Sequence, residues 1–127
     1  MRRLFVFLTI GLSLFACSKK PIIPSAQVLF DQAQGFEKTQ EFAKANESYQ
    51  MLINNYPASP LRYKALFMSG YIQLEQLKDN KKALEALETL VKEYPNCDLA
   101  DDARILLNVA VSGKDLMSVF QDSLKGK

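Results

Sequence analysis

The chain has 127 residues, of which 48% are hydrophobic, with only five Gly and five Pro, a composition typical of one globular domain rather than a disordered segment. Its 16 basic and 14 acidic residues balance once Arg2 and Arg3 at the N-terminus are set aside, so the clustered basic excess of a nucleic-acid-binding domain is missing. We therefore expect a core of modest size and no nucleic-acid partner.

The first predicted element is a secretory signal peptide, residues 1–16, in which a basic start precedes an apolar run from Leu4 to Ala16. That run of 13 residues is too short to cross a bilayer, which takes about 20. An uncleaved anchor or a buried helix is the alternative, and the Lys19 and Pro21 that follow weigh against both.

The quartet "LFAC" at the end of this run resembles the lipobox of bacterial lipoproteins, although Phe15 is bulkier than the residue usual at its position. The resemblance implies that Cys17 carries acyl chains such as palmitate, and several chains on one cysteine hold a protein firmly to a membrane. Ser18 is similar to the residue that follows the cysteine in lipoproteins sent to the outer membrane. Residues 17–24 contain two prolines and are expected to form a lipidated tether.

From Ser25 onward the chain has helical periodicity, and no segment shows the alternation of a strand. We predict an all-α domain with six helices, which lie within residues 25–40, 41–56, 60–77, 80–94, 99–111 and 115–124. Ser59 before Pro60 predicts the start of the third helix, and Asp98 is expected to cap the fifth.

Two of these helices end alike, in "INNYP" and "VKEYP", 38 residues apart. At this offset apolar residues coincide over both helices of a pair: Ala45 with Ala83, Tyr49 with Leu87, Leu52 with Leu90, Ile53 with Val91, Tyr56 with Tyr94, Leu61 with Leu99, Ala65 with Ala103, Phe67 with Ile105 and Met68 with Leu106. Such internal similarity indicates a repeated helix pair, in which each proline separates one pair from the next.

The spacing resembles the second helix of the tetratricopeptide repeat, with a small residue, core residues four and seven positions later, and proline twelve positions later. The matching residues are Ala45, Tyr49, Leu52 and Pro57, and Ala83, Leu87, Leu90 and Pro95. In the first helices, Leu29, Ala33 and Phe36 match the large, small and aromatic sites, and Gly70 is the small residue of the second unit. The resemblance implies an α-solenoid of about three helix hairpins over residues 25–124.

The period of 38 residues is longer than the usual 34, and is similar to the extended repeats of bacterial envelope proteins. Two such families are the lipoprotein subunit of the β-barrel assembly machinery and the periplasmic coordinator of the Tol and Pal system. The former has more repeats than this chain, and the latter usually has an added coiled coil and no lipid. We therefore transfer the architecture and no specific role.

The resemblance also implies a binding groove, which in stacked repeats is lined by the first helix of each unit. The corresponding positions in this sequence are Gln27, Phe30, Gln34, Glu37, Lys64, Phe67, Tyr71, Leu74, Asp102, Ile105 and Val109. Phe30, Phe67 and Tyr71 would form an aromatic strip suited to an extended or helical peptide. Lys64 and Asp102 would flank the strip. The alternative is that these rings are ordinary core between helices, and their exposure distinguishes the two interpretations.

We expect no catalytic, cofactor or metal site. The chain has no His to act as a general base, no glycine-rich phosphate loop, and no second free Cys to complete a soft metal site beside Cys97. The adjacent carboxylates Asp101 and Asp102 are expected to stabilise the first turn of a helix. With Cys17 lipidated, Cys97 is either an unpaired turn residue or the site of an intermolecular disulfide.

The sequence therefore supports two hypotheses. The first is a scaffold that is lipid-anchored in the outer membrane, faces the periplasm and binds a protein partner, with a role in outer-membrane protein assembly or envelope maintenance. The second is a structural envelope lipoprotein that assembles into homo-oligomers through Cys97 or the exposed end of the third unit, because three repeats are about the minimum for stability.

Overall fold

The computed structural model describes residues 21–126, apart from the side chain of Ser123. It contains six helices: α1 (Ala26–Lys38), α2 (Phe42–Asn55), α3 (Arg62–Glu75), α4 (Asn80–Glu93), α5 (Ala100–Ser112) and α6 (Leu116–Lys125). No strand occurs among these residues, which confirms the all-α prediction. None of the described helices is long and apolar enough to cross a membrane. The predicted signal peptide, residues 1–16, and Cys17 lie outside the described residues.

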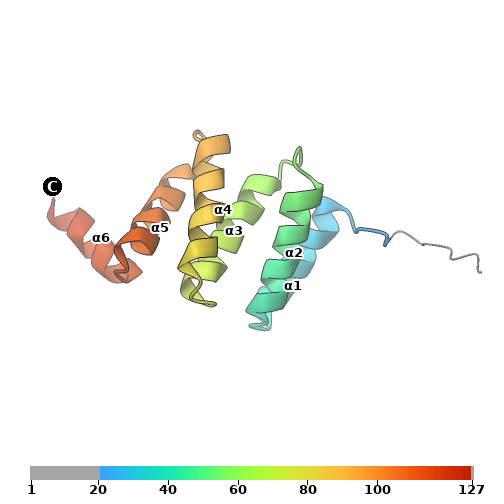
Figure 1. The fold of residues 1–127 in the computed structure, drawn as a ribbon, viewed down its shortest axis with the longest axis horizontal. Helices are drawn as coiled ribbons and strands as arrows, with labels where there is room; N and C mark the ends of the chain where they lie inside the picture. The colour runs from blue at the N-terminus through green and yellow to red at the C-terminus, as the bar shows by residue number, and fades with distance from the viewer. Residues whose placement is uncertain (1–20, 127) are drawn as a thin grey trace, which may run out of the picture.

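Consecutive helices form hairpins that stack in sequence order (Figure 1). Helix α1 packs against α2 and α3 against α4, and the second helix of each of these pairs also packs against the first helix of the next. Helices α5 and α6 share a much smaller contact. The fold is therefore the predicted α-solenoid of helix hairpins, with two closely packed hairpins and a looser third.

The two tyrosine-proline helix ends adopt one backbone conformation. Tyr56 has φ −128° and ψ 62°, and Tyr94 has φ −129° and ψ 55°. Proline disfavours the helical conformation in the residue before it, so Pro57 and Pro95 end α2 and α4 at equivalent points. The two residues that coincide at the 38-residue offset therefore also share a backbone conformation.

The turns inside the first two hairpins also match, although the sequence did not reveal it. Gln40, between α1 and α2, has φ 59°, and Lys78, between α3 and α4, has φ 56°. A left-handed conformation costs a residue with a side chain roughly 1–2 kcal/mol. Neither position holds the Gly or Asn that usually marks such a turn, so its geometry follows from the packing of the helices on either side.

Small residues allow the helices to approach one another. Five alanines, one in each of the first five helices, have no exposed surface: Ala33, Ala45, Ala65, Ala83 and Ala103. A Cβ atom on Gly70 would lie 2.6 Å from Cγ of the buried Leu87, so α3 and α4 need the glycine in order to pack at this distance. The prediction that Gly70 is the small residue of the second unit is consistent with this contact.

The first hairpin has a buried tyrosine, Tyr49, at the position of Leu87 in the second. Its ring has no exposed surface, and its hydroxyl donates a hydrogen bond to the carboxylate of Glu37. Burial and this carboxylate raise the pKa of Tyr49 far above its ordinary value. Glu37 therefore satisfies a core hydroxyl group, and does not stand free as a predicted groove residue.

Two caps were predicted from the sequence, Ser59 and Asp98, and neither caps a helix in the structure, whereas Asp79 does. Asp79 accepts a hydrogen bond from the Lys82 N–H at 3.1 Å and caps α4. The predicted Asp98 cap of α5 is wrong, because Leu99 precedes the helix and makes no side-chain cap hydrogen bond. The Asp98 carboxylate lies beside the Tyr63 hydroxyl instead. Desolvation, together with this carboxylate, raises the pKa of the hydroxyl.

Helix α3 begins at Arg62, two residues after the predicted start at Pro60. Residues 59–62 form a tight turn, in which the Arg62 N–H donates to the Ser59 carbonyl at 3.1 Å. The Ser59 hydroxyl accepts a hydrogen bond from the Leu61 N–H at 3.2 Å. Ser59 therefore stabilises the approach to α3 rather than its first turn.

Candidate protein-binding hollow

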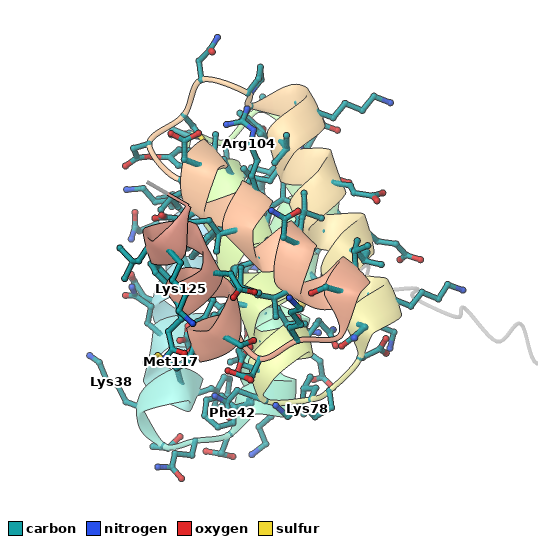
Figure 2. The ribbon with its side chains drawn as sticks, turned by 90° about the vertical axis from the view of Figure 1, so that its left-hand side faces the viewer. Lys38, Phe42, Lys78, Arg104, Met117 and Lys125 are labelled. Atoms are coloured by element: carbon teal, nitrogen blue, oxygen red, sulfur yellow. The ribbon has the colours of Figure 1, made fainter. Side chains whose placement is uncertain are left out.

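An apolar hollow of about 380 Å³ lies between α3, α5 and α6. It is lined by Phe67, Met68 and Tyr71 from α3, Asp102, Ile105 and Leu106 from α5, and Leu116 and Phe120 from α6. Figure 2 looks onto this end of the stack, where Met117 and Lys125 mark α6. Ligand sites in proteins typically have volumes of about 300–1,000 Å³.

Helical spacing explains why these side chains share one surface. Tyr71 follows Phe67 by four residues, and Phe120 follows Leu116 by four, so the members of each pair lie on one helix face. Phe67 and Tyr71 are half-buried against the core, whereas Phe120 is 48% exposed. The hollow therefore has a floor fixed by the core and a rim contributed by α6.

Four of the predicted groove residues meet in this hollow: Phe67, Tyr71, Asp102 and Ile105. They come from the second and third repeat units, and Phe67 and Ile105 are equivalent positions at the 38-residue offset. The overlay of the repeats thus identified a shared surface. Asp102 is the one residue with a formal charge among the described residues that line it.

The other predicted groove residues lie elsewhere. Val109 is 4% exposed and Leu74 is 5% exposed, so both are core residues, and the little surface that they expose borders a separate, smaller hollow beside Gly113. Helix α5 packs against α3 and α4, which covers the side of α5 that carries Val109. Three predicted positions are exposed but do not line the hollow: Gln27, Gln34 and Lys64.

The predicted aromatic strip is interrupted at Phe30. Its ring packs edge-on against the buried Tyr49, with ring centroids 5.5 Å apart. Phe67 and Tyr71 lie together in the hollow, whereas Phe30 belongs to the first hairpin and does not line it. All three rings are partly buried, so each combines core packing with some exposed surface.

Sequence reasoning missed four lining residues: Met68, Leu106, Leu116 and Phe120. A signal for the first two was present, because they coincide at the 38-residue offset and lie next to Phe67 and Ile105. For Leu116 and Phe120 the only signal was the amphipathic pattern of the last helix, which does not reveal where that helix packs.

Cys97, between α4 and α5, carries a free thiol and is partly exposed. Its N–H donates to the Tyr94 carbonyl at 3.2 Å, and its carbonyl accepts from the Ala100 N–H at 3.1 Å. Within the described residues it therefore serves as a turn residue. The prediction that it forms an intermolecular disulfide stays a prediction.

Comparison with known proteins agrees with this architecture. A sequence profile of the tetratricopeptide repeat family matches residues 27–59 and 64–96, which together make up just over half of the chain. The two segments coincide with the hairpins α1–α2 and α3–α4.

Among curated proteins, the chain is similar to the outer membrane protein assembly factor BamD of Caulobacter vibrioides, with 29% identity over 86 residues. The match covers 60% of this chain and 28% of that protein, so the chain spans less than a third of the length of this relative. No solved structure matches the chain. The repeat profile, the equivalent helix ends and the stacked hairpins lead to one conclusion: the chain belongs to the tetratricopeptide repeat family.

Proposed function

We propose that the chain is a scaffold that binds a protein partner in the hollow between α3, α5 and α6. The observation that carries the proposal is an open apolar surface built jointly by two repeat units and α6, with one charged side chain, Asp102, among its lining residues. Such a surface suits an amphipathic helix, whose apolar face fills the hollow while a basic residue faces Asp102.

We further propose that this scaffold acts at the outer membrane, in the assembly of outer-membrane proteins or in envelope maintenance. The name of the similar Caulobacter protein, an outer membrane protein assembly factor, supports this location. The lipobox-like sequence before Cys17 supports a lipid anchor, with the repeat domain facing the periplasm.

Site-specific photocrosslinking in the native envelope tests the partner site. A photoreactive residue at Ile105, in the hollow, is expected to give a discrete adduct with one protein. Asn108, which is exposed on the same helix but does not line the hollow, serves as the matched control. Absence of an adduct from Ile105, or the same adducts from both positions, would contradict the proposal.

The lipid anchor has its own test. A Cys17→Ala variant is expected to appear in the soluble fraction after cell lysis, because it lacks the only cysteine in the lipobox-like sequence. The unaltered chain should sediment with the membranes. Continued sedimentation of the variant would contradict the proposed lipid anchor. It would not bear on the partner site, which has its own test.

Self-assembly is the second candidate, and the C-terminal end of the stack favours it. Large apolar side chains are exposed there: Val111 by 74%, Met117 by 68%, Phe120 by 48% and Leu124 by 74%. Light scattering of the full chain, with and without reductant, separates the two functions. If the chain forms a dimer and Met117→Asp dissociates it, self-assembly through the apolar end is favoured. If reductant dissociates the dimer, Cys97 forms the contact. A monomer under all conditions would contradict self-assembly and favour the scaffold.

A further inference from the structure

A second cleft, of about 470 Å³, lies between α2 and α4 and has α3 as its floor. In Figure 1 these two helices stand side by side toward the viewer, and α3 lies behind them. The α2 wall presents three carboxamides at intervals of one helical turn, from Asn46, Gln50 and Asn54. The floor combines apolar side chains such as Leu66 with the amide of Gln73.

This cleft is separate from the apolar hollow. Helix α3 contributes Arg62, Leu66 and Gln73 to the cleft, and Phe67, Met68 and Tyr71 to the hollow. With 3.6 residues per turn, these two sets centre on opposite sides of α3. A ligand in the cleft would therefore leave the proposed partner site open.

A buried serine fixes the orientation of two amides in the cleft wall. Ser69 has no exposed surface, and its hydroxyl donates to Asn46 Oδ1 at 2.7 Å and accepts from Gln50 Nε2 at 2.8 Å. A hydroxyl has only one hydrogen to donate, and Ser69 donates it to Asn46, so Gln50 must bind the hydroxyl through its amino group. Asn46 then keeps its amino group, and Gln50 its carbonyl group, for a ligand.

The floor holds a further amide that lacks a partner. Gln73 is 3% exposed, and its side chain makes no hydrogen bond within residues 21–126. Among these residues no fully enclosed side-chain polar atom lacks a hydrogen-bond partner, so the Gln73 amide must open into the cleft that it lines. An amide so nearly buried is more stable when a group in the cleft pairs with it.

We propose that this cleft binds an extended, uncharged peptide segment through its main-chain amides. A carboxamide offers one donor group and one acceptor group, which match a backbone C=O and N–H. Asn46 and Gln50 are four residues apart, about 6 Å along the helix axis, which is close to the two-residue repeat of an extended chain, about 6.6 Å.

The charges around the cleft favour a neutral ligand. Lys82 in the α4 wall pairs with Asp79 at 3.5 Å, and Arg62 at one end of the floor pairs with Glu93. Glu85, the other charged residue that lines the cleft among the described residues, is exposed to solvent and disfavours an anionic ligand. No aromatic side chain is present among the described residues that line the cleft, so a sugar ring would find no flat apolar surface. Small polar residues such as Ser and Thr fit a lining of amides and aliphatic side chains.

Nuclear magnetic resonance of the ¹⁵N-labelled full chain tests this site, with acetyl-(Ser-Thr)₃-amide as the probe. Saturable shifts are expected in the side-chain amide signals of Asn46, Gln50 and Gln73. Gln50→Leu should weaken the binding about fivefold to tenfold, as for the loss of one hydrogen bond. Gln32→Leu, on the exposed side of α1, is the matched control and should leave the affinity unchanged.

Two further variants test whether the binding depends on the cleft. Ser69→Ala preserves both amides but no longer fixes their orientation, so it should also weaken binding of the probe. Unchanged backbone signals outside the cleft would show that the variant is still folded. Phe120→Asp, in the hollow, should have no effect on the probe. The proposal is overturned if the probe gives no saturable shift, if Gln50→Leu binds as tightly as the unaltered chain, or if a neutral trisaccharide shifts these signals and the peptide does not.

Discussion

Side-chain size at a few buried positions sets the distance between the helices of each hairpin. Gly70 faces Leu87 in the second hairpin, where a Cβ atom would lie 2.6 Å from Leu87 Cγ. Gly35, on the exposed side of α1, has no such neighbour within 4 Å. Two helical glycines in equivalent hairpins therefore have opposite roles, since one is required by packing and the other is not.

Alanine substitutions separate these roles. Gly35→Ala should raise the free energy of unfolding by about 0.5–1 kcal/mol, because alanine favours the helix. Gly70→Ala should lower it, because overpacking typically costs about 1–3 kcal/mol and outweighs the same helix preference. Urea denaturation measures both.

A double-mutant cycle provides the control for Gly70. In a Leu87→Ala background the added methyl group has room, so Gly70→Ala should lose most of its destabilising effect. An unchanged effect in that background would mean that contact with Leu87 is not the cause.

Helix capping by Asp79 makes the stability of the fold depend on pH. The hydrogen bond from the Lys82 N–H lowers the pKa of Asp79 below its ordinary value of 3.8. Because the pKa of Asp79 is lower in the folded chain than in the unfolded chain, the cap stabilises the fold at pH values above the ordinary pKa. This stabilisation is lost as the pH falls through the pKa of the folded chain.

Asp79→Asn keeps the cap acceptor but does not titrate. The unaltered chain should therefore be the more stable of the two near neutral pH, and the difference in Tm should shrink below about pH 4. Asp115→Asn removes the equivalent carboxylate from the start of α6. Because α6 is loosely packed, that substitution should change Tm less, and an equal change would contradict the description of α6.

At the scale of elements, arginines connect one repeat unit to the next. Arg62 Nε donates to the Ile53 carbonyl at the end of α2 at 3.2 Å, and its Nη1 group donates to Glu93 and to the Tyr94 hydroxyl at the end of α4. The Arg62 side chain is only 12% exposed. It therefore joins the first unit to the second through a side chain that is mostly buried.

The next junction has a weaker version of this contact. Arg104 Nη2 donates to the Pro95 carbonyl at 3.2 Å, the same nine-residue reach as from Arg62 to Ile53, but the Arg104 side chain is 46% exposed. Arg62→Met should lower the free energy of unfolding by about 1.5–3 kcal/mol. Arg104→Met should lower it by less than about 1 kcal/mol. Similar losses for the two variants would show that burial does not decide the strength of these junctions.

The sequence predicted the helices and their repeat well, for identifiable reasons. Proline and alanine act locally, so the ends of α2 and α4 and the close-packed faces could be read from spacing alone. The left-handed turns at Gln40 and Lys78 could not, because neither residue signals one. Asp98 was wrongly expected to cap α5, since a nearby tyrosine hydroxyl competes for its carboxylate.

At the scale of the whole molecule, stacking creates two surfaces of different chemistry on opposite sides of α3. The apolar hollow faces α5 and α6, and the amide-lined cleft faces α2 and α4. Part of the hollow was predictable, because Phe67 and Ile105 occupy equivalent repeat positions. The rim formed by Leu116 and Phe120 was not, because the position of α6 depends on long-range packing. Val109 shows the same limit, since neighbouring helices decide its burial.

The central claim is that the hollow between α3, α5 and α6 holds a protein partner, and one measurement tests it most directly. The yield of the photocrosslink from Ile105 in the native envelope is compared between Phe120→Asp, which places a charge at the rim of the hollow, and Met117→Asp. Met117 lies on the same helix, is more exposed and does not line the hollow. We expect the adduct to be lost in Phe120→Asp and retained in Met117→Asp, whereas equal yields in the two variants would contradict the claim.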